Sequence, residues 1–183
     1  MIHMSQIQYN IIENLLKKTN HIRGIAKELQ TNQTTIARKV QELQQENILD
    51  FHTQGRNKVF FLKKNLEAQQ YIYLFEHHKL LEIIKKYPRL RQIIQTIRKN
   101  NNIELAVLFG SYAKMTAGKE SDIDIYICST NPQLKKELEQ IDSLVSIKIG
   151  KYDPANLLIK EIEKKHIILK GVEKYYEKNK LLM

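Results

Sequence analysis

Cysteine and long apolar segments are scarce in this sequence, and both absences limit the classes of protein to which it can belong. Cys128 is the only cysteine among 183 residues, which excludes an internal disulfide. A single cysteine fits a reducing cytosol, and we expect its thiol to be a buried structural group. No apolar run approaches the roughly 18 residues of a membrane-crossing helix, and the amphipathic first 20 residues lack the apolar core of a signal peptide. We therefore expect a globular, cytoplasmic protein without repeats or low-complexity tracts.

Positive charge, by contrast, is abundant. The chain has 30 Lys and Arg residues against 20 Asp and Glu residues, which is a formal net charge of +10 at neutral pH. This balance favours polyanionic partners, namely nucleic acids or nucleotides. A generic lysine-rich surface is the alternative that the charge alone leaves open.

Apolar residues recur at helical spacing in three segments near the N-terminus, and two short β patterns follow around a turn at Gly55. The helices are expected at residues 5–18, 20–29 and 33–45, and the strands at 48–52 and 58–62. Three short helices followed by a β-hairpin form a winged helix-turn-helix. The sequence therefore predicts this arrangement for the first part of the chain.

Residues 21–63 resemble the winged-helix domains of ArsR- and MarR-like prokaryotic regulators. The segment Thr-Asn-Gln-Thr-Thr-Ile-Ala-Arg-Lys-Val-Gln-Glu-Leu, which begins at Thr31, resembles the start of a recognition helix. The resemblance implies binding to double-stranded DNA, with this helix in the major groove and the wing on the backbone or minor groove. The side chains expected to contact DNA are Gln33, Thr34, Thr35, Arg38 and Lys39 on the helix and Arg56 and Lys58 at the wing. A winged helix that binds only proteins is the alternative.

A long helical pattern over residues 66–86 follows the predicted wing. Pro88 ends it, and a second helix is expected to run to about residue 100. Winged-helix regulators commonly dimerise through such a helix, so we expect a homodimer; a brace within one chain is the alternative. The expected organisation is a DNA-binding domain at 1–65, a helical linker at 66–100 and a second domain at 101–183.

The second domain carries the most informative motif of the chain. An apolar run from Ile103 to Phe109 ends in Gly110-Ser111, and Asp122 and Asp124 follow, separated by one isoleucine. Residues two apart in a strand face the same side, so both carboxylates are expected at one point. Paired carboxylates suit Mg²⁺, and a Gly-Ser turn offers backbone N–H groups to a phosphate. A polar strand edge is the alternative interpretation of the two aspartates.

Alternating β and α patterns continue to the C-terminus. Strands are expected at 103–109, 122–128, 144–150 and 166–169, and helices at 132–142, 154–164 and 171–179. The fold class expected for the chain is therefore α+β, with an N-terminal winged helix-turn-helix, a helical linker and a C-terminal mixed sheet flanked by helices.

Residues 103–170 resemble the minimal nucleotidyltransferase domains of the DNA polymerase β superfamily, through Phe109-Gly-Ser-Tyr-Ala-Lys and Ser121-Asp-Ile-Asp-Ile. The resemblance implies that Gly110 and Ser111 hold the β- and γ-phosphates of a nucleoside triphosphate. Asp122 and Asp124 would then be the catalytic, Mg²⁺-binding residues. The acceptor hydroxyl would attack the α-phosphorus and release pyrophosphate. Two nearby lysines, which are otherwise ordinary surface residues, are expected to add positive charge at the phosphates: Lys114 and Lys119.

The chain departs from this family pattern at two positions. Met115 stands where the family often has glycine, and Ser146 stands where active members usually carry a third carboxylate. The nearby acids Asp142, Asp153 and Glu161 do not lie centrally in the expected strand. Without a third acid, the attacking hydroxyl loses its base and one metal loses a ligand.

Two functions are therefore expected as alternatives. The first is a Mg²⁺-dependent nucleotidyltransferase that carries a DNA-binding winged helix and modifies a protein, an RNA or a small molecule. The second is a DNA-binding regulator, or an antitoxin-like protein with a protein partner, whose nucleotidyltransferase domain senses nucleotide or is degenerate. The missing third carboxylate favours the second.

Overall fold

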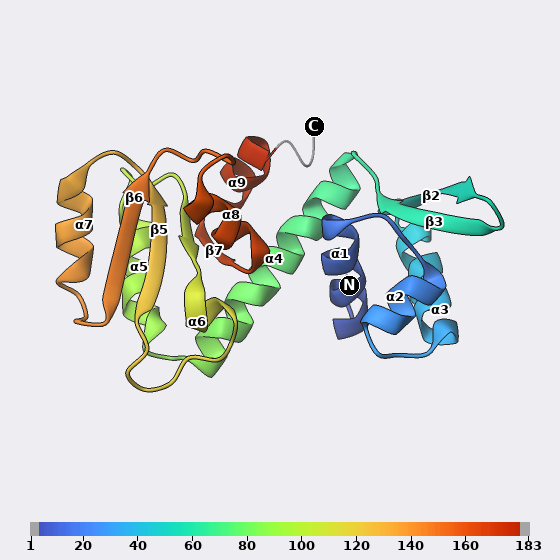
Figure 1. Ribbon diagram of the computed structural model, residues 1–183, viewed down its shortest axis with the longest axis horizontal. Helices are drawn as coiled ribbons and strands as arrows, with labels where there is room; N and C mark the ends of the chain where they lie inside the picture. Colours follow the sequence, from blue (N-terminus) through green and yellow to red (C-terminus); the bar gives the residue numbers. More distant parts are fainter. Residues whose placement is uncertain (1–3, 180–183) are drawn as a thin grey trace. The chain divides into compact units, whose positions relative to one another are not determined.

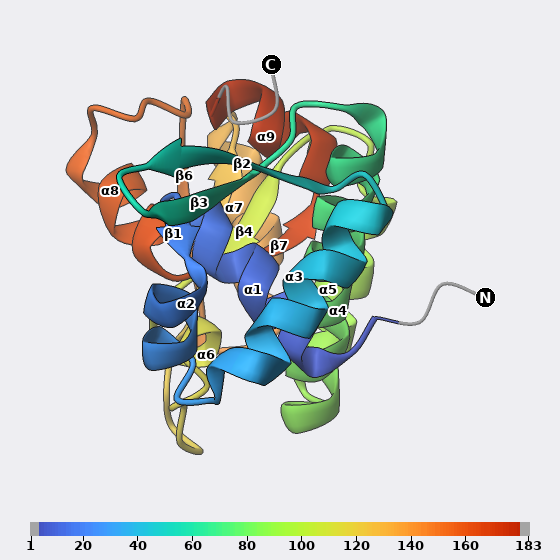
Figure 2. The same ribbon diagram turned by 90° about the vertical axis from the view of Figure 1, so that its right-hand side faces the viewer.

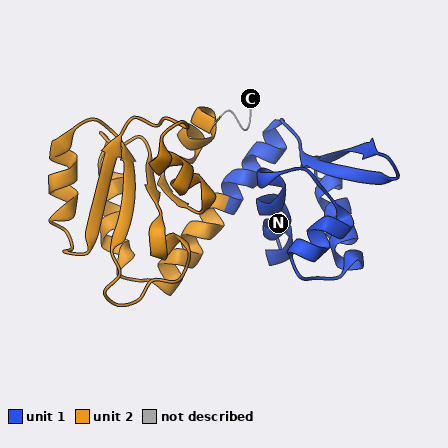
Figure 3. Cartoon of the chain, viewed as in Figure 1, with its two compact units in different colours: residues 1–75, 182 blue, residues 76–181, 183 orange. Residues whose placement is uncertain are grey.

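A computed structural model describes residues 4–179 of the protein. The chain forms two compact units, one ending at Phe75 and the other beginning at Glu76 (Figure 3). The division falls inside the long helix α4 (Leu66–Lys86), whose bounds match the helix expected from the sequence. Within the described residues, no helix combines the length and the hydropathy that crossing a membrane requires.

The N-terminal unit is a winged helix-turn-helix, as predicted. Its elements are α1 (Gln6–Lys17), β1 (Asn20–His21), α2 (Ile22–Glu28), α3 (Gln33–Gln45), β2 (Leu49–Gln54) and β3 (Asn57–Leu62). The antiparallel hairpin β2–β3 forms the wing, and β1 pairs with β3 on its other side (Figure 2). The sequence did not predict β1, because a strand of two residues has no periodicity to detect.

Buried aliphatic side chains explain why these helices form and pack. The α3 helix begins at the N-cap Asn32, whose side-chain oxygen accepts a hydrogen bond of 2.7 Å from the N–H of Thr35. The buried residues on this unit's helices recur at helical spacing: Ile11, Ile12 and Leu15 in α1, Ile25 in α2, and Ile36, Val40 and Leu43 in α3. The opposite side of α3 is therefore free of the core.

The C-terminal unit is a four-stranded mixed sheet flanked by helices, which confirms the predicted α+β class. After the second half of α4 come α5 (Leu90–Lys99), β4 (Ala106–Leu108), α6 (Gly110–Ala113), β5 (Ile123–Cys128), α7 (Pro132–Glu139), β6 (Val145–Gly150), α8 (Leu157–Lys164), β7 (Ile167–Lys170) and α9 (Val172–Asn179). The strand order is β6-β5-β4-β7 (Figure 1). The β5–β6 pair is parallel, with α7 as its crossover, and the other pairs are antiparallel.

The two faces of this sheet differ in chemistry. Ile123, Ile125 and Ile147 belong to one buried cluster with apolar residues of α5, α7 and the second half of α4. In Figure 1, α5 passes behind β5 and β6 on this apolar side. The residues that alternate with them, such as Asp124 and Ser146, therefore lie on the other face. At the start of β5 and β6, polar residues thus lie on the face opposite this cluster.

Tyrosines and one histidine cover part of the polar face. Tyr126 of β5 contacts Tyr152 edge-on at a ring separation of 6.3 Å, and its hydroxyl donates to the carbonyl oxygen of Gly150. His166 packs on Tyr175 of α9 at 4.7 Å. Cys128, which we expected to be buried, is only half-buried because it is the last residue of β5.

The helix α4 exposes two leucines seven residues apart. Leu74 is 40% exposed and Leu81 is 57% exposed. Residues seven apart lie on nearly the same side of a helix. Dimerisation through this helix remains a prediction.

His166 should make the C-terminal unit sensitive to acid. Burial, followed by the charge of Lys79, lowers the pKa of His166 from 6.5 to about 3, and its Nε2 atom has no hydrogen-bond partner among the described residues. The pKa of His166 is lower in the folded state than in the unfolded state. The protein is therefore most stable above pH 6.5, and its free energy of unfolding falls as the pH falls from 6.5 towards 3. We expect the free energy of unfolding to fall by up to about 1.4 kcal/mol per pH unit in this window.

The variant His166→Phe keeps an aromatic ring against Tyr175 and should lose most of this pH dependence. Urea unfolding between about pH 7 and about pH 4 measures the effect, with the exposed His77→Gln as the control. An equal loss of stability in the wild type and in His166→Phe would contradict this prediction.

Candidate functional site

The turn after β4 lies directly against the first half of β5. The N–H of Phe109 donates to the carbonyl oxygen of Asp124 at 2.9 Å, and Gly110 begins α6 with a φ of +69°. A Cβ atom added at Gly110 would lie 2.4 Å from Oδ2 of Asp124. Both the left-handed backbone and the close approach therefore require glycine at this position.

Asp122 and Asp124 share the polar face of the sheet. Asp122 is exposed immediately before β5, Asp124 is half-buried inside it, and Ile123 between them points into the core. Burial raises the pKa of the Asp124 carboxyl, the charge of Asp122 raises it further, and Lys148 lowers it. A divalent cation shared by these carboxylates would offset their repulsion, and two hard oxygen donors fit Mg²⁺. The residues present therefore fit a magnesium site.

The strand register places Ser146 beside these aspartates. Asp124 of β5 pairs with Ser146 of the parallel strand β6, so a serine lies directly beside the half-buried carboxylate. Within residues 4–179, no group of three or more His, Cys, Asp or Glu side chains is arranged to hold a metal ion. The acidic part of the candidate site is thus a pair.

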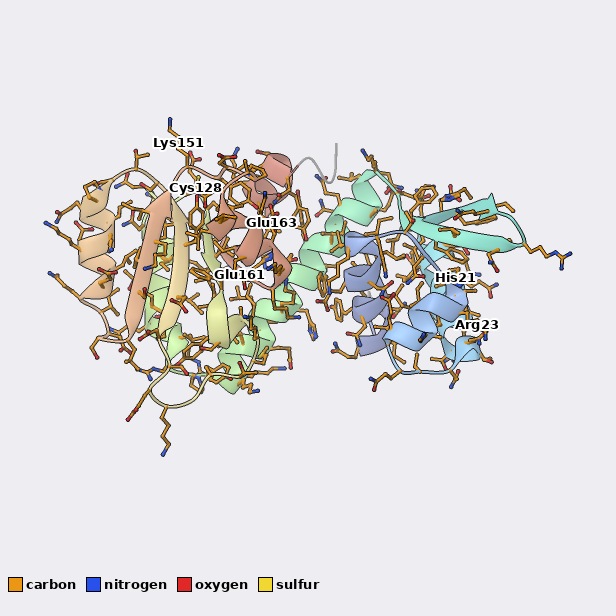
Figure 4. All side chains as sticks on the ribbon, in the orientation of Figure 1. His21, Arg23, Cys128, Lys151, Glu161 and Glu163 are labelled. Atoms are coloured by element: carbon orange, nitrogen blue, oxygen red, sulfur yellow. The ribbon has the colours of Figure 1, made fainter. Side chains whose placement is uncertain are left out.

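The acids Asp142, Asp153 and Glu161, which lie outside the expected strand, have other partners. Asp142 forms an ion pair with Arg89 at 2.7 Å, and Asp153 accepts a hydrogen bond from the N–H of Ala155. Glu161 on α8, labelled in Figure 4, pairs with Lys164 at 2.8 Å. None of these contacts involves Asp122 or Asp124.

The loop between the turn and β5 carries both predicted phosphate-binding lysines. Lys114 is exposed, and its Nζ lies 3.9 Å from Oε1 of Glu161. Lys119 is also exposed, and its carbonyl oxygen accepts from Arg89. Ser121 stabilises the turn before β5, because its Oγ accepts from the N–H of Gly118 at 2.9 Å. Contact of the two lysines with phosphates remains a prediction.

The backbone of this loop shows why glycine is favoured at the position of Met115, one of the two departures from the family pattern. Met115 has a φ of +61°, a region in which glycine is favoured. Its carbonyl oxygen accepts a hydrogen bond of 2.7 Å from Nζ of Lys86, at the end of α4. The loop therefore keeps a glycine-like conformation with a methionine side chain in it.

Most of the predicted DNA-contacting residues on α3 lie on its outer side. Gln33, Thr34 and Arg38 are exposed, whereas Thr35 is half-buried near the N-cap. Lys39 is also half-buried and forms an ion pair with Glu42 at 2.7 Å. The helix thus presents Gln33, Thr34 and Arg38 most directly, and DNA contact by all five residues remains a prediction.

The wing residues Arg56 and Lys58 are exposed as well. The Nζ of Lys58 lies 4.2 Å from the ring centre of Phe51, so the ammonium rests on the aromatic face of the hairpin. This contact keeps the cation on the wing surface, where a phosphate can approach it.

Two cations beside the turn of the helix-turn-helix were not predicted from the sequence: Arg23 and Lys27. An open pocket of about 830 Å³ is lined by residues of α2, the turn and the start of α3: Arg23, Ala26, Lys27, Gln30, Thr31, Asn32 and Gln33. Figure 4 shows Arg23 on α2. The i, i+4 spacing of Arg23 and Lys27 was the available signal, since such residues share one side of a helix.

Comparison with known sequences identifies relatives of the C-terminal unit. The model of the family described as "Polymerase beta, Nucleotidyltransferase" matches residues 91–180. A protein of Methanocaldococcus jannaschii, named "Putative protein adenylyltransferase", is 35% identical over 75 residues. That match covers 41% of this chain and 72% of the relative.

Comparison with solved structures gives weaker matches. The adhesin competence repressor AdcR of Streptococcus pyogenes is 22% identical, with a TM-score of 0.40 over 49% of this chain and 66% of the repressor, just under two thirds of its length. ZitR of Lactococcus lactis is 16% identical, with a TM-score of 0.38 over 52% of this chain and 70% of that chain. The winged-helix assignment rests on the topology of the chain itself.

Proposed function

The chain belongs to the polymerase β nucleotidyltransferase family, and we propose that it transfers a nucleoside monophosphate from a Mg²⁺-bound nucleoside triphosphate to an acceptor hydroxyl. The observation that carries this proposal is the contact between Gly110 and Asp124. It joins the phosphate-binding turn and the paired carboxylates in one site.

The groups of the site would have separate roles in the transfer. Backbone N–H groups at the start of α6 lack helical partners and are available to the β- and γ-phosphates beside Gly110 and Ser111. Asp122 and Asp124 would hold Mg²⁺, which neutralises phosphate charge when bound. The acceptor oxygen forms a bond to the α-phosphorus while the bond to the bridging oxygen breaks. Pyrophosphate leaves with that electron pair, and the hydroxyl proton passes to solvent.

We propose ATP as the donor and a protein hydroxyl as the acceptor, following the description of the M. jannaschii relative. The test is to incubate the chain, in a lysate that supplies acceptors, with ATP labelled at either the α- or the γ-phosphate. Transfer predicts a protein band labelled from α but not from γ. If no band that depends on the added chain is labelled from the α-phosphate, this function is excluded; bands labelled from γ also arise from kinases in the lysate.

A DNA-binding role is the second candidate, favoured by the exposed polar side of α3 and the cations near its start. We propose that the winged helix binds duplex DNA, whether the C-terminal unit is a transferase or a nucleotide sensor. Binding should weaken steeply as salt rises, because phosphate contacts release counterions.

Arg38→Ala is expected to weaken duplex binding by about tenfold or more, because it removes an exposed cation from the groove-facing side of α3. Gel shifts at low salt measure the effect. Lys17→Ala is the matched control, since it removes one charge from α1. Equal affinities of the two variants would exclude α3 as the reading helix.

A further inference from the structure

Three adjacent strands place polar groups side by side on the face of the C-terminal sheet opposite the cluster of Ile123, Ile125 and Ile147. Gly110 and Ser111 follow β4, Asp122 and Asp124 lie at the start of β5, and β6 contributes Ser146. Because β5 and β6 pair in parallel with Asp124 opposite Ser146, the row continues directly from the carboxylates to β6.

Lys148 is the next residue of β6 on this face. It pairs with Tyr126, two residues beyond the pairing of Ser146 with Asp124, so its side chain projects from the same side as both. Lys148 is exposed, and in the parallel pair it lies diagonally across from Asp124, two residues beyond Ser146 on the neighbouring strand. The ammonium is therefore a neighbour of the carboxylate pair.

The order of the row indicates which part of a nucleotide would reach Lys148. The β- and γ-phosphates belong at the Gly110-Ser111 turn, on the β4 side of the aspartates. With the strand order β6-β5-β4, the α-phosphate of such a nucleotide would lie over β5, and the acceptor would approach from the side of β6. A flexible lysine side chain rising from β6 can meet the α-phosphate there.

Formal charge supports the same placement. Three carboxylates with two divalent ions carry one net positive charge, which offsets the phosphate charge in a two-metal site. Here two carboxylates, one divalent ion and one ammonium would also carry one net positive charge. With Ser146 in place of a third acid, Lys148 thus gives the site the same net charge as a site with three carboxylates and two metal ions.

We propose that Lys148 is a catalytic residue that contacts the α-phosphate and takes the electrostatic place of a second metal ion. This inference rests on the proposed nucleotidyl transfer. In that step, the ammonium stabilises the charge that grows on the non-bridging α-oxygens as the acceptor bond forms and the pyrophosphate bond breaks. Lys148 keeps its own protons throughout.

Calorimetry of the full chain tests the phosphate contact. Lys148→Ala is expected to weaken Mg²⁺-ATP binding about tenfold and to leave the affinity for Mg²⁺-pyrophosphate unchanged, because pyrophosphate lacks the α-phosphate. Lys148→Arg should stay close to the wild type. Lys151→Ala is the matched control, since Figure 4 shows Lys151 projecting away from the sheet beyond β6.

Mn²⁺ titration followed by electron paramagnetic resonance counts the ions in the ATP complex, and we expect one per bound ATP. Two ions in the wild-type complex, or unchanged ATP affinity in Lys148→Ala, would overturn the proposed role of Lys148 and leave the proposed function standing. ATP binding that is absent from the wild type would remove the proposed function and this inference together. Equal losses of ATP and pyrophosphate affinity would also overturn the α-phosphate contact.

Discussion

Asp124→Asn is expected to weaken Mg²⁺-dependent ATP binding at least about hundredfold. Asp124 sits inside β5 against Gly110, so it is the more firmly positioned of the two carboxylates. An amide removes the negative charge that Mg²⁺ requires from a hard oxygen ligand. Since changes that touch only the partners of metal ligands cost about 10–100-fold in affinity, the loss of a ligand itself should cost at least as much.

Calorimetric titration with ATP, with and without Mg²⁺, measures this effect. Glu120→Gln is the matched control, because Glu120 is exposed on the loop two residues before Asp122 and its replacement removes the same charge. The assignment of the metal site fails if Asp124→Asn binds Mg²⁺-ATP as tightly as Glu120→Gln does.

Gly110→Ala is expected to impair the site through geometry, without any change of charge. The added Cβ would lie 2.4 Å from Oδ2 of Asp124, so the carboxylate must move away from the phosphate turn. The backbone at Gly110 is left-handed, which costs an alanine about 1–2 kcal/mol. We expect at least about a tenfold loss of ATP affinity, together with a fall in the free energy of unfolding of the size of this backbone strain.

Gly118→Ala provides the control for Gly110→Ala. Gly118 lies in the same loop, and a Cβ added there would meet only Oγ of Ser121 at 3.9 Å, an ordinary contact. Urea unfolding and ATP titration of both variants separate the two effects. If Gly110→Ala binds ATP like the wild type, the close packing of the turn on Asp124 is irrelevant to nucleotide binding.

The helices and strands with strong periodicity could be predicted closely from the sequence. The predicted ranges of α3 and α4 agree with the structure, because apolar residues repeat at helical spacing over three or more turns. The prediction was incomplete where elements are very short. The four residues of α6 were expected to form only a turn, since a single helical turn contains no repeat.

The candidate site, too, could be predicted only in part from the sequence. The sequence alone determined that Asp122 and Asp124 share a face, because alternation along a strand is a local property. It also determined that a glycine and a serine follow the preceding apolar run. Only the tertiary structure decided that Gly110 lies against Asp124 and that β6 aligns Ser146 and Lys148 beside the pair. These neighbours depend on strand order and register, which arise from packing between segments that are distant in the chain.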